Sequence, residues 1–142
     1  MNSQIELVRL NPLAPALVPE TRGAAGRDLI TTMNFWLYPG QTKLIPTGIA
    51  IRMPESMCGM ILSRSGLGSK NLVVTQGVGL IDSDYQKEIF VPLTNRGLEG
   101  PPAKFTAGQR IAQIVFVPVF SPSVQLVEAF EDNGRGGFGS TG

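Results

Sequence analysis

The segment GLIDSDYQKEIF, residues 79–90, gathers three carboxylates and a tyrosine between two apolar runs. Asp82 directly follows Leu80 and Ile81, so its carboxylate can lie half-buried against aliphatic side chains, where it could act as a general base for water. A turn in which Asp82 hydrogen-bonds nearby backbone, with Tyr85 as an ordinary strand aromatic, explains the same residues at least as well. The segment indicates a site, but it does not say which reaction the site would serve.

The segment SRSGLG, residues 63–68, has the composition of a phosphate-binding turn. The guanidinium of Arg64 can bond two oxygens at once, the hydroxyl of Ser65 can donate one more hydrogen bond, and Gly66 lets backbone amides approach a ligand closely. A surface turn with one solvated arginine is the alternative that these six residues leave open.

Two further segments carry polar groups beside apolar ones. In AAGRDL, residues 24–29, Asp28 can orient a metal-bound water or cap a turn, and the cap is the simpler explanation for this segment alone. The segment AGQRIAQIVF, residues 107–116, has the alternation of a strand, whose faces would be Ile111, Gln113 and Val115 on one side and Arg110, Ala112 and Ile114 on the other. An edge strand with polar side chains is enough to explain it.

The composition excludes several kinds of chemistry. The chain has no histidine and one cysteine, Cys58, which excludes Ser-His and Cys-His nucleophiles, histidine-based zinc sites and cysteine clusters. Hydrolysis by an aspartate base with a hard metal ion remains possible. A net charge of +1 gives no global field for nucleic acid or an anionic membrane, so neither is an expected partner. The single cysteine and the lack of a signal-peptide pattern predict a cytoplasmic protein.

Short apolar runs separated by glycine and proline predict an all-β fold. The chain has 17 glycines and 11 prolines, and the runs between them are rich in Val, Ile, Thr and Phe. They predict strands within residues 4–10, 42–53, 58–64, 71–76, 87–95, 110–120 and 124–130. We expect one jelly-roll-like β-barrel domain over residues 1–132. Residues 133–142 would form a glycine-rich, flexible lid segment of the same domain.

Taken in order, these segments resemble the five motifs of the trimeric dUTP pyrophosphatase (dUTPase) family. AAGRDL is similar to the first motif, SRSGLG to the second, QGVGLIDSDYQKEI to the third, GQRIAQIVF to the fourth and GGFGSTG to the fifth. The resemblance runs from about Gly23 to Gly142, and YPGQTKLIPTGIAI and LTNRG fit between the motifs. Each motif alone is weak evidence, but five in this order with compatible spacing are strong evidence.

The resemblance implies a jelly-roll subunit, a homotrimer with active sites at the subunit boundaries, and Mg²⁺-assisted hydrolysis of dUTP to dUMP and pyrophosphate. Such an enzyme clears dUTP from the nucleotide pool and supplies dUMP for dTMP synthesis. Asp82 would be the base that deprotonates the water attacking the α-phosphorus. Tyr85 would stack on the deoxyribose and exclude a 2′-hydroxyl. Asp84 and Glu88 have no such role, and we interpret them as structural or solvated.

The resemblance also implies how the chain would bind the nucleotide. A hairpin over residues 72–80 would read uracil through its backbone, with Gly77 and Gly79 permitting close approach and Gln76 beside the base. The α- and β-phosphates would be held by Arg64, Ser65, Gly66 and Gln113.

The metal and the tail complete the implied site. Asp28 and Gln113 would orient waters on a Mg²⁺ that the triphosphate itself mainly holds. Phe138 would close over the uracil ring, and the γ-phosphate would be contacted by Arg135, Gly139, Ser140 and Thr141. Closure would exclude water from the reaction.

Two positions depart from the family pattern. Lys87 stands where the family usually has glycine, which alters the charge after Tyr85. The tail arginine of the family usually lies five residues before the phenylalanine, where this chain has Asn133, whereas Arg135 lies only three residues before Phe138. The role of the tail arginine therefore does not transfer to Arg135 position by position.

Three other functions share part of this evidence. A dCTP deaminase is a relative with the same fold and a similar nucleotide site, although the GLIDSDY pattern and the Phe138 tail favour the pyrophosphatase. A non-catalytic nucleotide-binding or protein-binding homologue is a second alternative, which the presence of Asp82, Arg64, Ser65 and Gln113 disfavours. A structural jelly roll such as a capsid component is a third, but it gives no reason for five polar motifs in order.

Overall fold

The structure is a computed structural model that describes residues 4–139. Within that range the chain forms ten strands and one helix. They are β1 (Glu6–Arg9), β2 (Arg27–Ile30), β3 (Phe35–Leu37), β4 (Thr42–Arg52), β5 (Met57–Leu62), α1 (Ser65–Gly68), β6 (Leu72–Val74), β7 (Val78–Ile81), β8 (Glu88–Asn95), β9 (Ala103–Phe105) and β10 (Arg110–Pro118). None of these residues belongs to a helix long and apolar enough to cross a membrane.

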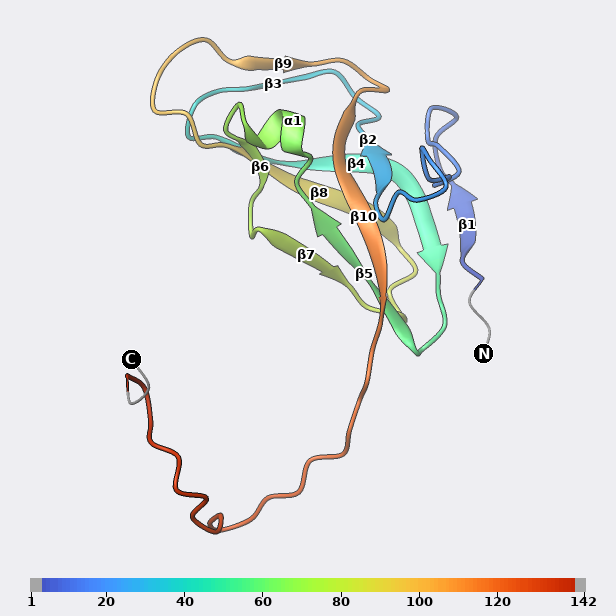
Figure 1. The fold of residues 1–142 in the computed structure, drawn as a ribbon. Helices are drawn as coiled ribbons and strands as arrows, with labels where there is room; N and C mark the ends of the chain where they lie inside the picture. Colours follow the sequence, from blue (N-terminus) through green and yellow to red (C-terminus); the bar gives the residue numbers. More distant parts are fainter. Residues whose placement is uncertain (1–3, 140–142) are drawn as a thin grey trace.

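Two four-stranded antiparallel sheets form the body of the molecule (Figure 1). Their strand orders are β1-β4-β8-β6 and β2-β10-β5-β7, and β3 pairs with β9 in a separate ribbon. From β4 to β8, each strand lies in the opposite sheet from the strand before it, which is typical of jelly-roll folds. The all-β, jelly-roll-like fold expected from the sequence is confirmed.

Alternate residues of the strands fill a single core to which both sheets contribute. In β8, Ile89, Val91 and Leu93 are fully buried, while the residues between them are more exposed. Ile61 of β5 and Ile114 of β10 join the same cluster from the other sheet. Because successive strand residues point to opposite faces, this alternation fixes which polar side chains reach the surface.

Six of the seven predicted strands are present, but the strand predicted within residues 124–130 is not. Residues 119–139, here called the arm, contain no strand, and all of them are exposed. Figure 1 shows the arm leaving the end of β10 and running away from both sheets. A strand needs a neighbouring strand for its backbone hydrogen bonds, and no strand of the described residues pairs with the arm. Only its first residue is tied to the body, through the amide of Val119, which donates to the carbonyl of Ser56 at 2.8 Å.

A bulge in β4 gives Glu88 a structural role. The register between β4 and β8 shifts between Pro46 and Ala50, and Gly48 at the shift has φ +75°. The amide of Gly48 donates a hydrogen bond of 3.2 Å to Oε2 of Glu88. This contact agrees with the interpretation of Glu88 as structural or solvated, and it holds the start of β8 three residues after Tyr85.

Candidate active site

Three of the predicted motifs meet in one open cavity of about 380 Å³, which is lined by Glu20, Ala24, Ala25, Gly26, Asp28, Arg64, Ser65, Gly66 and Gln113. The sheet register explains the meeting. In β10, Gln113 pairs with Asp28 of β2 on one side and with Leu62 of β5 on the other. Arg64 follows Leu62 by two residues, so the segments that are distant in sequence become adjacent strands and loops.

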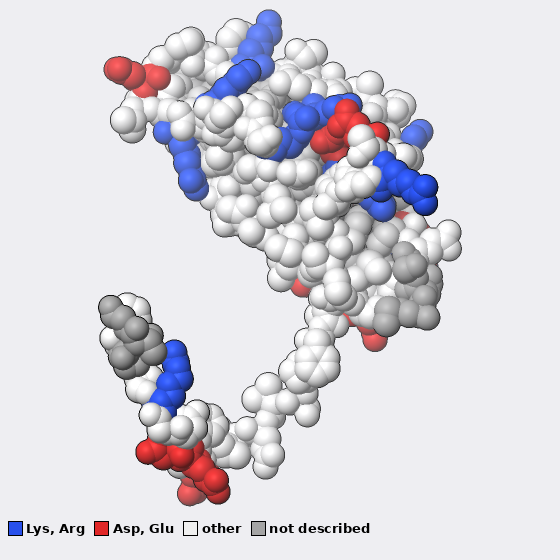
Figure 2. Space-filling view, viewed as in Figure 1, with Lys and Arg blue, Asp and Glu red and all other residues white. Residues whose placement is uncertain are grey.

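Asp28 is shared between two arginines. Its Oδ1 lies 3.1 Å from Nε of Arg64, and its Oδ2 lies 3.4 Å from Nε of Arg110. Arg110 also places Nη1 3.4 Å from Oε1 of Glu20. On the face shown in Figure 2, acidic and basic side chains lie directly against one another in one mixed cluster on the body. The cavity therefore holds both anion-binding and cation-binding groups.

The predicted faces of β10 are wrong at Arg110. The register between β10 and β2 shifts between Arg110 and Ala112, so Ile111 turns into the core beside Ala112. Arg110 is left half-exposed, with 49% of its side chain accessible, where it meets Asp28. A bulge adds one residue to a strand and reverses the alternation beyond it. Polar alternation alone gave no sign of this bulge, and nothing in the sequence around Glu20 marked it as part of the site.

Gln113 presents an amide oxygen because its nitrogen is already engaged. Nε2 of Gln113 donates a 3.1 Å hydrogen bond to the carbonyl of Ser63. Its Oε1 packs against Gly26, where an added Cβ would clash with it. A larger residue at position 26 would therefore displace the flexible end of the Gln113 side chain, which is a packing reason for glycine that the sequence did not reveal.

The turn predicted to bind phosphate, residues 63–68, is anchored to the rest of the fold by two of its side chains. The side chain of Leu67 is buried, while Ser65 and Gly66 are exposed to the cavity side. Oγ of Ser63 accepts a 2.9 Å hydrogen bond from the amide of Val74. An added Cβ on Gly66 would meet nothing within 4 Å. The turn is therefore anchored by Ser63 and Leu67, and it presents open space around Gly66.

The proposed base and the tyrosine lie in a different cavity. This cavity of about 310 Å³ is lined by Leu44, Leu80, Ile81, Asp82, Tyr85 and Phe90. The amide of Tyr85 donates to the carbonyl of Asp82 at 3.1 Å, and the Tyr85 hydroxyl donates to the carbonyl of Glu88 at 2.7 Å. Asp82 is exposed, which corrects the expectation of a half-buried carboxylate. Its apolar neighbours form an open wall and do not enclose it within this chain.

The two cavities lie at opposite ends of the β5–β7 ladder. Ile81 pairs with Gly59, so Asp82 lies beside Cys58, whereas Arg64 lies six residues farther along the β5 segment. At about 3.3 Å per residue the separation is about 20 Å. That distance exceeds the reach of either side chain. One chain therefore brings Asp28, Arg64 and Gln113 together but leaves Asp82 and Tyr85 apart from them.

The predicted uracil-binding hairpin is a corner between the two sheets. β6 pairs with β8 and β7 pairs with β5, so β6 and β7 are not partners. Gly77 at the corner has φ +80°, a conformation that favours glycine. An added Cβ on buried Gly79 would lie 3.3 Å from Cβ of Ile61. Gln76 and Gly77 are exposed at this corner, with backbone groups near the surface.

Most of the predicted lid residues lie at the far end of the arm. Phe138 is fully exposed, and the amide of Arg135 donates a 3.0 Å hydrogen bond to Oδ1 of Asn133. Gly139 has φ +82°. Ser140 and Thr141 lie outside the described residues. In Figure 2 the arm carries a group of acidic side chains followed by a basic one, well away from the body.

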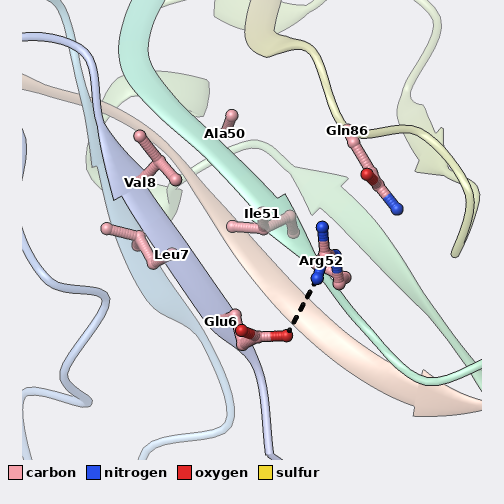
Figure 3. Close-up of a pocket in the computed structure, with 7 residues that line it drawn as sticks. All are labelled: Glu6, Leu7, Val8, Ala50, Ile51, Arg52 and Gln86. Atoms are coloured by element: carbon pink, nitrogen blue, oxygen red, sulfur yellow. Dashed lines mark ion pairs between the residues drawn. The ribbon is translucent and has the colours of Figure 1, made fainter.

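A third hollow of about 250 Å³ contains none of the predicted residues. It lies against β1 and β4 (Figure 3) and is lined by Glu6, Leu7, Val8, Ala50, Ile51, Arg52 and Gln86. Its charged groups, Glu6 and Arg52, approach to 3.6 Å and are mostly exposed. Such a surface pair leaves no unsatisfied charge to attract a ligand.

Comparisons with known proteins agree with the geometry. The family model described as dUTPase matches residues 13–142. The chain is 45% identical over 152 residues to a deoxyuridine 5'-triphosphate nucleotidohydrolase of Shewanella denitrificans, covering 100% of this chain and 99% of that protein. It is 48% identical over 128 residues to the protein of the same name from Haemophilus influenzae, covering 86% and 83%. A mutant dUTPase of Staphylococcus bacteriophage 80alpha, solved with dUpNHpp, has a TM-score of 0.83 and 26% identity over 99% of both chains.

Proposed function

Because this chain belongs to the dUTPase family and is a dUTP-hydrolysing enzyme, we propose that it works as a homotrimer whose active sites combine two cavities from neighbouring copies. The observation that carries this proposal is that Asp82 follows β7 and Arg64 follows β5 at opposite ends of their ladder, about 20 Å apart at about 3.3 Å per residue. Both groups are needed at one triphosphate. A second copy is the simplest source of the missing half of each site.

The first cavity is the proposed triphosphate site. Arg64 can turn its guanidinium from Asp28 to phosphate oxygens, with the hydroxyl of Ser65 and the exposed backbone at Gly66 as further donors. Donors held in place before the reaction stabilise charge that develops as the bond to the leaving oxygen breaks. The same residues would hold the pyrophosphate as it leaves.

The donors in this cavity fit a magnesium ion that is held mainly by the substrate. Asp28 and Gln113 offer a carboxylate and an amide oxygen that can accept hydrogen bonds from metal-bound water, and the described residues contain no cluster of three or more His, Cys, Asp or Glu that could hold the ion directly. Hard cations of this kind keep several waters and are usually bound through a few protein oxygens plus phosphates. When bound, Mg²⁺ would neutralise charge on the phosphate oxygens. Asp28 and Gln113 would then accept hydrogen bonds from its waters.

The second cavity supplies the proposed base. Asp82 would accept a proton from a water as that water bonds to the α-phosphorus, and the bond from this phosphorus to the bridging oxygen would break. The products are dUMP and pyrophosphate. Because Asp82 is exposed in one chain, seating a neighbouring copy and substrate over it would remove the surrounding water.

Tyr85 of this cavity would select the sugar, and the corner before β7 would select the nucleobase. The hydroxyl of Tyr85 is tied to the carbonyl of Glu88, and Glu88 is tied to the β4 bulge, so the ring is supported by two successive hydrogen bonds. A ring held in this way can pack on deoxyribose and leave no room for a 2′-hydroxyl. Uracil would bind the exposed backbone at Gln76 and Gly77, next to buried Gly79, where unpaired polar groups would disfavour cytosine.

Replacing Tyr85 with alanine should weaken the discrimination between dUTP and UTP by roughly tenfold or more, because the ring that crowds the 2′ position is lost. The measurement is the inhibition constant of UTP against dUTP hydrolysis. Tyr85→Phe is the matched control, since it keeps the ring and removes only the hydrogen bond to Glu88. If UTP competes no better with the alanine variant than with the phenylalanine variant, Tyr85 does not select the sugar.

The arm provides a proposed lid that acts between copies. It leaves the body beyond Pro118 and runs away from both sheets (Figure 1), and Arg135 and Phe138 near its end are exposed. A segment that is exposed throughout can reach another copy, where Phe138 would cover uracil and the residues after it would contact the γ-phosphate.

The single cysteine, Cys58, remains the basis for proposing a cytoplasmic location.

The function is tested by incubating the protein with dUTP, dCTP, dTTP and UTP in separate reactions while its mass in solution is measured. Pyrophosphate from dUTP far above that from the other three, together with a trimeric mass, is the expected result. Ammonia release from dCTP would contradict the assignment and point to a deaminase. A monomeric mass with full activity would contradict the shared site.

A further inference from the structure

The ion pairs around Asp28 form a chain of four alternating charges. Glu20 contacts Arg110, Arg110 contacts Oδ2 of Asp28, and Oδ1 of Asp28 contacts Arg64. Asp28 and Arg64 are the more enclosed members, with 25% and 31% of their side chains accessible, whereas Arg110 and Glu20 are about half or more exposed. Asp28 and Arg64, the two groups proposed to meet the metal-bound triphosphate, are therefore paired with each other in the free chain.

A metal-bound triphosphate would compete for both members of this pair. Phosphate oxygens would compete with Asp28 for Arg64, and waters on the cation would compete with Arg64 for Oδ1 of Asp28. Each exchange would free the partner that the other exchange uses, so the two would compensate each other. Once Arg64 has turned away, Asp28 would be held on Oδ2 by Arg110 alone. A carboxylate without that second partner would be free to rotate away from the cation.

We propose that Arg110 is a positioning residue that holds Asp28 toward the metal-bound triphosphate while Arg64 leaves for the phosphates. Glu20 in turn fixes the guanidinium of Arg110. This inference rests on the proposed function, because it assumes that Asp28 meets the cation through water. Its consequence is that Arg110 acts on the contribution of Mg²⁺ to binding and contacts no substrate atom itself.

The local structure is better explained by this role than by a contribution to stability. The bulge that exposes Arg110 lies at the cavity, and the neighbouring core position is filled by Ile111 whether or not Arg110 is present. Ion pairs as exposed as those of Arg110 typically contribute little to folding. The guanidinium offers a fixed fork that can bond Asp28 and Glu20 at once, which a lysine ammonium cannot reproduce.

The test measures binding of dUpNHpp by calorimetry, with saturating Mg²⁺ and with a chelator. The quantity compared is the factor by which Mg²⁺ lowers the Kd for dUpNHpp. For Arg110→Gln we expect this factor to fall by about tenfold, the scale on which groups that orient metal ligands act. Binding without metal should stay within about twofold of wild type. Glu20→Gln should show a smaller change in the same direction, and Arg110→Lys should recover part of the loss.

Arg27→Gln is the matched control. Arg27 lies next to Asp28 in β2, but its guanidinium lies over the ring of Phe116, 5.6 Å from the centroid, and outside the chain of ion pairs. This variant should keep the full effect of Mg²⁺. Thermal unfolding of all variants is measured in parallel, and Arg110→Gln should unfold at nearly the wild-type temperature.

Two results would overturn the inference. One is an unchanged effect of Mg²⁺ in Arg110→Gln. The other is an equal loss of binding with and without metal, which would mean that Arg110 contacts phosphate or maintains the fold. If the wild-type protein binds dUpNHpp neither with Mg²⁺ nor with the chelator, the proposed function is contradicted, and this inference is contradicted with it.

Discussion

Replacing Asp82 with asparagine should lower kcat for dUTP hydrolysis by about 10²–10⁴-fold, the range by which general bases accelerate reactions. Asparagine has nearly the same shape as aspartate but cannot accept the proton from the attacking water. Asp82 is exposed and uses only its backbone carbonyl to hold the turn to Tyr85, so the fold should not change. Pyrophosphate release under saturating dUTP is the measurement.

Asp84 provides the matched control for this variant. It lies two residues away in the same turn, is also exposed, and has no proposed contact with substrate. Asp84→Asn should therefore retain nearly wild-type turnover. Binding of dUpNHpp should be similar in both variants. Turnover of Asp82→Asn within a few-fold of the Asp84→Asn value would remove Asp82 as the base.

Deleting residues 134–142 should leave the mass in solution that of the proposed trimer and reduce turnover by about 10²-fold or more, because lids complete and dehydrate active sites. Every described residue of the arm is exposed, so its last part contributes no core packing to its own chain. The loss should appear in both kcat and KM, since the lid would contact the uracil ring and the γ-phosphate of the substrate. Mass in solution and thermal unfolding report the state of the truncated protein.

Two point variants separate the lid from the rest of the arm. Phe138→Ala should reproduce much of the truncation, whereas Phe130→Ala removes an equally exposed phenylalanine outside the proposed lid. If the truncated chain no longer folds or assembles, the segment is structural. The lid would also be wrong if truncation left kcat and KM unchanged.

The sequence predicted the longer strands because their burial alternates along the chain. β8 shows this best, with Ile89, Val91 and Leu93 buried in alternation. The strands absent from that prediction, β2, β3, β7 and β9, contain three or four residues. β1 and β6 are as short, but they lie within longer apolar runs, which is why the sequence predicted them. The apolar run within residues 124–130 wrongly predicted a strand, because its pattern is strand-like although the structure has no strand there. A suitable pattern does not supply a pairing partner in the same chain.

The sequence indicated which residues line the candidate cavity, but not how the strands of one chain bring them together. The motif order indicated Asp28, Arg64 and Gln113, and the register of β2, β10 and β5 places them together. The bulge that directs Arg110 to Asp28 depends on how β10 pairs with β2, which no local pattern encodes. Glu20 lies in a loop without a motif and enters the site only through its contact with Arg110.

Mixing two inactive variants tests most directly whether neighbouring copies share one site. Asp82→Asn and Arg64→Ala are co-expressed with different affinity tags, and trimers carrying both tags are isolated. In a cyclic trimer where Asp82 of one copy meets Arg64 of the next, every mixed trimer has one intact site and should show about a third of wild-type activity. Mixed trimers as inactive as their parents would mean that both residues act within one copy, which contradicts the account.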